Sequence, residues 1–217
     1  MIHMRYAEFK DHKIQRTCTK EFKHFRTYAK YLQKDFHNRC CYCNMSDELL
    51  TVSYHVEHFI PRKAFEGVRD ELDTDYNNLM WACPKCNLSK GNKYKGDLLN
   101  SDKIENKFFY NPVETDYNTI FYRNEFGGIA SDDPKGKEMI RLLKLYRPVH
   151  NLAWLLERFE NLTIQLSEKI KQEKNPEKAK ILEEALNKVG VQCVRLEQIF
   201  RAVYKGKRIF FEIEDEE

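Results

Sequence analysis

The spacing of apolar residues predicts helices at both ends of the chain. Between Phe22 and Phe36, apolar side chains recur every three or four residues, as they do on one face of an amphipathic helix. Beyond Pro134 three further helical stripes follow, and the Asn175-Pro176 pair separates the second stripe from the third. Both ends of the chain are therefore expected to be helical.

Short apolar runs between these regions predict strands. Residues 49–54 and 79–82 are two such runs, each too short for an independent helix and bounded by turn-forming residues. The Gly127-Gly128 pair predicts a hairpin turn between a strand over residues 119–123 and a short return strand. Helices and strands in separate stretches of the chain predict an α+β fold that is mainly helical.

The charge distribution brings nucleic acid into consideration. Lys and Arg number 37 and Asp and Glu 34, which gives a formal net charge of +3 over 217 residues. From Arg5 to Arg39, however, ten basic residues stand against four acidic ones. We interpret these basic side chains as the solvated outer face of a helix, or as a phosphate-binding face if a neighbouring segment handles nucleic acid.

Composition also bears on the compartment. Charged residues make up 33% of the chain, and no apolar run reaches the roughly 18 residues that a membrane span requires. The segment from Met1 to Arg5 lacks the apolar stretch of a signal peptide. We therefore expect a soluble, cytoplasmic protein.

The cysteines predict a metal site. Seven cysteines in a chain with no export signal do not suggest a disulfide framework. Two Cys-x2-Cys pairs, Cys40/Cys43 and Cys83/Cys86, offer four thiolates for a tetrahedral and therefore structural zinc. Cys41 could replace Cys40 as a ligand, and the spacing alone does not decide between them.

The segment between and after these pairs contains three further motifs. They are Val56-Glu57-His58-Phe59-Ile60-Pro61, Tyr76-Asn77-Asn78-Leu79-Met80, and Cys86-Asn87-Leu88-Ser89-Lys90-Gly91-Asn92-Lys93. These motifs resemble the HNH endonuclease family. The shared pattern is an acid-His pair before a proline, a central Asn-Leu and an Asn after the last cysteine, interleaved with zinc-knuckle cysteines. The resemblance covers residues 40–93, about a quarter of the chain.

The resemblance implies a ββα-metal core built on the zinc knuckle, and a role for each motif. By this comparison His58 is the general base, Glu57 and Asn87 hold a catalytic Mg²⁺ or Mn²⁺, and Asn78 orients the histidine. Lys90 is expected to contact phosphate. The chemistry of the residues agrees, since an imidazole with a pKa near 6.5 is a base at neutral pH and hard oxygens suit these cations.

One geometric condition follows from strand geometry. Neighbouring side chains of a regular strand point to opposite sides, so Glu57 and His58 can share a site only if the strand ends or bends there. Pro61, shortly afterwards, fits that requirement. The segment 87–93 is expected to hold a short helix that ends near Gly91. We interpret the nearby His55 as a structural residue.

Four segments are expected along the chain. Residues 1–39 form a basic N-terminal helical segment, and residues 40–107 form the HNH nuclease core with its zinc knuckle. Residues 108–133 form an aromatic hairpin, and residues 134–217 a helical docking region. This layout is similar to that of nuclease subunits in Septu-type and retron-associated antiphage defence systems, which implies an ATPase partner on the C-terminal helices.

The expected function is metal-dependent hydrolysis of DNA phosphodiester bonds. The alternative is a zinc-stabilised nucleic-acid-binding or adaptor module with a degenerate site. The sequence leaves open whether the substrate is DNA, RNA or tRNA. It also leaves open any sequence preference, the oligomeric state, the partner's identity and the activation trigger.

Overall fold

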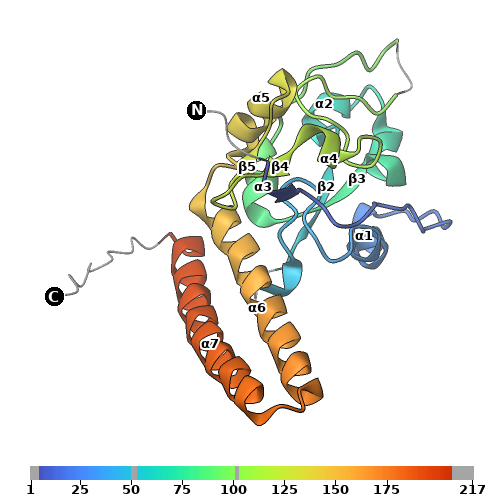
Figure 1. Cartoon of the computed structure of the whole chain (residues 1–217). Helices are drawn as coiled ribbons and strands as arrows, with labels where there is room; N and C mark the ends of the chain where they lie inside the picture. Colours follow the sequence, from blue (N-terminus) through green and yellow to red (C-terminus); the bar gives the residue numbers. More distant parts are fainter. Residues whose placement is uncertain (1–4, 50–52, 101–102, 207–217) are drawn as a thin grey trace. The chain divides into compact units, whose positions relative to one another are not determined.

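The structure is a computed structural model that describes residues 5–49, 53–100 and 103–206. Its internal contacts divide the chain into two compact units, Met1–Arg147 and Pro148–Glu217. Short helices and strands make up the first unit, and two long helices make up the second (Figure 1). The α+β, mainly helical fold predicted from the sequence is confirmed.

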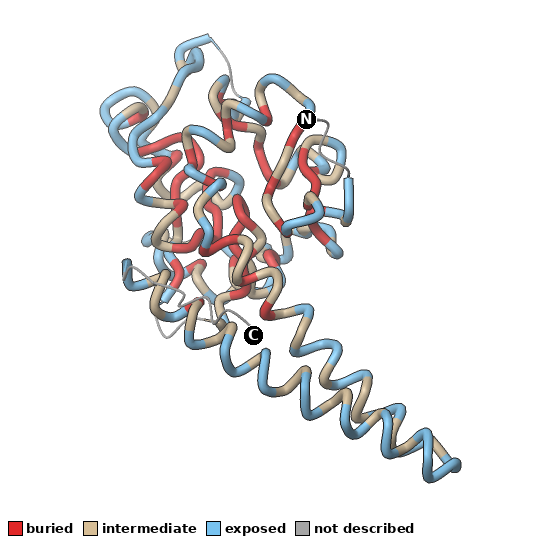
Figure 2. Tube along the Cα trace, turned by 60° about the vertical axis from the view of Figure 1, so that its left-hand side comes forward, coloured by how far each residue is buried: buried red, intermediate tan, exposed pale blue. Residues whose placement is uncertain are grey.

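The first unit contains ten helices and strands besides single 3-10 turns, all within the described residues. In chain order they are β1 (Ala7–Glu8), α1 (Ala29–Asp35), β2 (His55–His58), α2 (Arg62–Phe65), β3 (Leu79–Ala82), α3 (Pro84–Lys90), α4 (Tyr117–Ile120), β4 (Tyr122–Arg123), β5 (Ile129–Ala130) and α5 (Pro134–Leu143). Most of the buried residues of the chain belong to this unit (Figure 2).

Strands β2 and β3 form an antiparallel hairpin, which α3 follows directly. His55 pairs with Ala82 and His58 with Leu79 in an unbroken register. Odd-numbered residues of β2 therefore point to one face of the hairpin and even-numbered residues to the other. The strand continues through His58 without the bend that the shared site of Glu57 and His58 requires.

The first predicted strand is displaced along the chain. The run 49–54 overlaps a 3-10 turn at Asp47–Leu49, residues 50–52 lie outside the described residues, and the strand itself, β2, follows the run. The apolar pattern misplaces this strand because two of its four side chains are polar groups that pair with α3. The strand predicted over 79–82 is confirmed as β3.

Helix α3 begins earlier than predicted, at Pro84. Cys83 is its N-cap, and the Cys83 sulfur accepts a hydrogen bond from the backbone N–H of Cys86 at 3.4 Å. A proline at the first helical position sacrifices no helical hydrogen bond. The helix ends at Gly91, whose positive φ of 50° favours glycine. The helix predicted over 87–93 thus has the right end and the wrong start.

The helix in the basic N-terminal segment is shorter than the apolar pattern predicts. Between Phe22 and Phe36 the regular part is α1, preceded by a 3-10 turn over Phe25–Tyr28. Residues 9–24 contain no helix. Their backbone is held instead by side chains distant in sequence, for example by the Asp35 carboxylate, which accepts the backbone N–H of Thr17 at 3.1 Å.

The predicted hairpin at Gly127 is confirmed, but the strand predicted over residues 119–123 is shorter than expected, because α4 extends to Ile120 and β4 begins at Tyr122. Strands β4 and β5 pair across this turn, and β1 adds to the other edge of β4. Gly127 has a φ of 72°, which a side chain would strain. Buried Arg123 donates hydrogen bonds to the carbonyl oxygens of Gly127 at 3.0 Å and Cys43 at 3.2 Å. This sheet is thereby joined to the first cysteine loop.

The second unit is a hairpin of two helices, α6 (Pro148–Gln172) and α7 (Pro176–Tyr204), which lie side by side (Figures 1 and 2). The predicted break at Asn175 is confirmed. The Asn175 side chain caps α7 by accepting the backbone N–H groups of Glu177 and Lys178. Over the described residues, every helix is too short or too polar to span a bilayer.

The predicted helical region 134–217 divides between the two units. Helix α5 belongs to the first unit, and α6 and α7 to the second. The internal contacts of the structure group the first three predicted segments, with α5, into one unit. They do not test the boundaries between these segments, which remain a prediction.

Candidate functional site

Four cysteine sulfurs converge at the base of the β2–β3 hairpin. Cys40, Cys43, Cys83 and Cys86 are buried, and their ligand atoms all lie within 4.8 Å of one another. Four sulfurs about 2.3 Å from one zinc in a tetrahedron stand about 3.8 Å apart. The Cys43 and Cys83 sulfurs are 3.9 Å apart. The arrangement fits a structural zinc.

The structure also decides between the two adjacent cysteines. Cys41 is buried, but it is not a member of the four-sulfur group. Its backbone instead links the knuckle to its surroundings: its N–H donates to the carbonyl oxygen of Trp81 at 2.8 Å, and its own carbonyl accepts from the Lys10 ammonium at 3.0 Å. Cys40 is therefore the member of the first pair.

His58 lies on the even-numbered face of β2, against aromatic rings. The ring centroids of Phe25 and Phe65 lie 4.8 and 5.8 Å from that of His58, whose side chain is 8% exposed. Its Nε2 is 3.0 Å from the backbone carbonyl oxygen of Asp73 and 3.2 Å from the Asp73 carboxylate, which also pairs with Arg62. Burial lowers the pKa of His58 below its usual value, although Asp73 opposes this.

Asn78 is fully buried and holds two backbone segments together. Its side-chain oxygen accepts the N–H of Ile60 at 2.8 Å, and its NH₂ donates to the carbonyl oxygens of Ile60 at 3.2 Å and Leu72 at 3.0 Å. One segment follows His58 and the other precedes Asp73. Asn78 thus fixes the chain on both sides of the His58–Asp73 contact without touching the imidazole itself.

Glu57 lies on the odd-numbered face of β2, and its contacts are internal. The Lys90 ammonium pairs with Oε1, and the Tyr42 hydroxyl donates to Oε2 at 2.9 Å. The Glu57 side chain is 4% exposed and that of Lys90 0%. Burial raises the pKa of the Glu57 carboxyl, while Lys90 and Tyr42 act in the opposite direction. Lys90 also donates to the carbonyl oxygen of His58 at 2.8 Å.

Asn87 lies one turn before Lys90 on α3 and meets a residue that was interpreted as structural. Its side-chain nitrogen is 2.8 Å from Nδ1 of His55, which is exposed at the start of β2. Both side chains line a surface hollow of about 640 Å³, which we call the β2–α3 hollow. Its other lining residues include Phe25, Arg26, Tyr54 and Trp81.

The comparison with known families agrees with this arrangement. Residues 40–93 match the family model of the HNH endonucleases. The matched residues, called the HNH segment below, run from the first zinc-knuckle cysteine to three residues past α3 and make up about a quarter of the chain. Neither a search of curated proteins nor one of solved structures finds a match to the chain.

Within the HNH segment, the predicted site residues fall into two groups. Glu57 and Asn87 lie on the α3 side of the hairpin, whereas His58 lies on the opposite side with Asp73. Asn87 is accessible from the hollow and could serve as a cation ligand. Glu57 does not fit, because both of its carboxylate oxygens are engaged inside the core.

The expected phosphate contact of Lys90 also differs from the structure. Its ammonium is fully buried between Glu57 and the backbone of His58 and cannot reach a phosphate in this arrangement. The sequence pattern placed it on the surface because it lies three residues after Asn87, on the same side of the helix. That side of α3 is the one that packs on β2.

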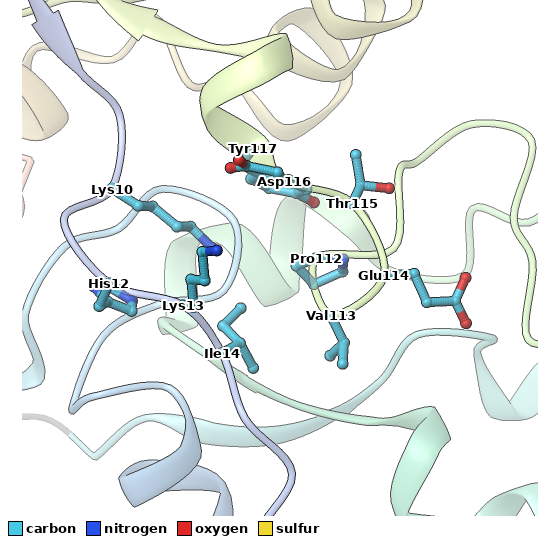
Figure 3. Close-up of a pocket in the computed structure, with 10 residues that line it drawn as sticks. All are labelled: Lys10, His12, Lys13, Ile14, Pro112, Val113, Glu114, Thr115, Asp116 and Tyr117. Carbon is cyan, nitrogen blue, oxygen red and sulfur yellow. The ribbon is translucent and has the colours of Figure 1, made fainter.

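The sequence does not identify two residues that contact the site, Asp73 beside His58 and Lys10 beside the first cysteine loop. Asp73 has no motif and reaches His58 only through the fold. Lys10 belongs to the basic run that was interpreted as a solvated or phosphate-binding face, but its side chain is buried. Its ammonium lies 4.5 Å from the centroid of the Tyr117 ring, and both residues line a small pocket together with residues 12–14 and 112–116 (Figure 3). Burial lowers the pKa of Lys10 to about 8.

We predict that one zinc ion per chain is bound and that Cys40 and Cys41 differ sharply in their contribution. Cys40→Ser should lose the zinc and most of the thermal stability, because binding of a structural zinc contributes on the order of 10 kcal/mol to folding in small zinc domains. Cys41→Ser should keep the zinc and melt only slightly earlier. Elemental analysis and thermal denaturation measure both; equal zinc content in the two variants would contradict the assignment.

Proposed function

We propose that the chain is a nuclease that hydrolyses phosphodiester bonds of DNA with a divalent cation, Mg²⁺ or Mn²⁺. The match of residues 40–93 to the HNH endonucleases carries this proposal. The environment of His58 supports it, because an imidazole whose pKa is lowered by burial stays unprotonated at neutral pH and can accept a proton from water.

The contact with Asp73 determines which nitrogen of His58 is the base. A backbone carbonyl oxygen only accepts hydrogen bonds, so in the neutral ring the proton is on Nε2, 3.0 Å from that oxygen. The lone pair is then on Nδ1. In the proposed reaction Nδ1 takes a proton from a water molecule, and the resulting hydroxide attacks phosphorus. The bond from phosphorus to the leaving sugar oxygen breaks, and that oxygen takes a proton from solvent. Asp73 is a positioning residue.

Positive side chains near the hairpin support a nucleic-acid substrate. Arg26 lines the β2–α3 hollow, and Lys30 and Lys34 are exposed on α1, which packs near β2 and β3. Such cations release counterions from the phosphate backbone whatever the base sequence. The proposed cleavage is accordingly non-specific or weakly specific.

His58→Ala should lower the rate of plasmid nicking by about 10²- to 10⁴-fold, the usual contribution of a general base. Zinc content should not change, because the imidazole is no ligand of the cysteine cluster. Nicking at the wild-type rate would discard His58 as the base. Tight DNA binding in EDTA without cleavage when Mg²⁺ or Mn²⁺ is restored would instead support the binding or adaptor module.

The pH dependence of nicking should follow His58. Its lowered pKa puts the acid limb of the kcat/KM profile below the usual histidine value of about 6.5. Asp73 raises this pKa and Arg62 and Lys90 lower it, so Asp73→Asn should move the limb to lower pH and Arg62→Gln to higher pH. Shifts of the two variants in the same direction would contradict the role of Asp73.

The second unit is proposed to bind a protein partner, expected to be an ATPase in an antiphage defence system. Its support is the layout of the chain, together with large apolar side chains exposed on α6 and α7. These are Leu162, Ile164, Ile181, Val191 and Val194. Purification from the native host should recover an ATPase with the full chain, and less of it with Val191→Asp/Val194→Asp. Recovery of none would count against this proposal.

A further inference from the structure

Two side-chain pairs join β2 to α3 at successive levels of one interface. His55 meets Asn87, and Glu57 meets Lys90. Residues two apart on a strand share a face and lie about 7 Å apart, and residues three apart on a helix lie about one turn apart. The spacing of the two residues on β2 therefore matches the spacing of their partners on α3. We call His55–Asn87 the outer pair and Glu57–Lys90 the inner pair.

The inner pair is complete without a cation. The Glu57 charge is balanced by the Lys90 ammonium, and its second oxygen accepts the Tyr42 hydroxyl. A cation bound to Glu57 would have to enter the core, where this side chain is 4% exposed, and would lie beside the buried Lys90 ammonium, whose like charge opposes it.

The outer pair has the opposite properties. His55 is exposed, Asn87 is half-buried, and both line the β2–α3 hollow. A histidine nitrogen and the amide oxygen of asparagine are both donors to transition-metal cations. The Asn87 amide nitrogen already lies 2.8 Å from Nδ1 of His55, so a half-turn of the amide, which exchanges its nitrogen for its oxygen, brings a nitrogen and an oxygen donor together in the hollow.

We propose that His55 and Asn87, and not Glu57, are the protein ligands of the divalent cation of this chain. The role of that cation in catalysis rests on the proposed nuclease function, but its binding does not. The buried Glu57–Lys90 pair then has a different function: it holds α3 at the distance from β2 at which the outer pair can meet.

This ligand set predicts a metal preference. An imidazole nitrogen binds Mg²⁺ poorly, because Mg²⁺ prefers oxygen ligands, whereas Mn²⁺ accepts both donor types and Co²⁺ and Ni²⁺ bind nitrogen more tightly still. The outer pair should therefore bind Mn²⁺ more tightly than Mg²⁺. A site of Glu57 and Asn87, with oxygen donors alone, would show a smaller preference for Mn²⁺ over Mg²⁺ and a smaller gain from Co²⁺ and Ni²⁺.

The test is Mn²⁺ binding by the zinc-loaded full chain, followed through the electron paramagnetic resonance signal of free Mn²⁺, with Mg²⁺ as competitor. His55→Ala and Asn87→Ala should each weaken binding by about tenfold or more, at least the loss seen when a metal ligand's supporting contact is removed. His58→Ala is the matched control. It removes an imidazole from the opposite face of the same strand and should bind Mn²⁺ like the wild type, whether or not the chain is a nuclease.

Glu57 is tested in a background that keeps the core neutral. The double variant Glu57→Gln/Lys90→Met removes both buried charges but keeps side chains of similar size, so the spacing between β2 and α3, and with it the Mn²⁺ affinity, should be retained. Zinc content and the melting curve should confirm its fold. Wild-type affinity in His55→Ala would overturn the proposal. So would affinity lost only in the double variant, or no Mn²⁺ binding by the wild-type chain.

Discussion

The four-sulfur cluster is the constraint on which the HNH segment depends. It ties the loop of Cys40 and Cys43 to the start of α3, where Cys83 is also the helix N-cap. The strands between these points are only four residues long. Strands of that length and a seven-residue helix are not stable alone. Zinc binding of roughly 10–16 kcal/mol, as in zinc fingers, matches the whole stability of an ordinary domain. A zinc ion bound by these sulfurs would therefore position the side chains of the hairpin and of α3.

One set of polar contacts on each face of β2 positions the candidate site residues. On one face of β2, the buried Glu57–Lys90 pair fixes the spacing to α3 and leaves His55 and Asn87 at the solvent edge. On the other face, Asn78 fixes the segments on both sides of the contact between His58 and Asp73. Phe25 connects the two faces, since it packs on the His58 ring and lines the β2–α3 hollow. The proposed base and the proposed cation ligands thus belong to opposite faces of one strand.

The sequence predicted those features that depend on local spacing. Two cysteine pairs, the Gly127 turn, the helix break at Asn175-Pro176 and the strand over 79–82 are local patterns, and the structure confirms each of them. Features that depend on which groups meet in space were predicted less well. Alternation along β2 separates Glu57 from His58, and no local pattern reveals that Lys90 turns inward. Asp73 reaches His58 from 15 residues away, so only the folded chain identifies it.

X-ray absorption at the zinc edge of the purified full chain tests the central claim most directly. The account predicts one zinc with four sulfur neighbours at about 2.3 Å and no nitrogen or oxygen neighbour. A zinc bound by mixed sulfur and nitrogen or oxygen atoms, or a folded chain that holds no zinc, would contradict it. Either result would remove the frame from which the placement of His55, His58 and Asn87 has been argued.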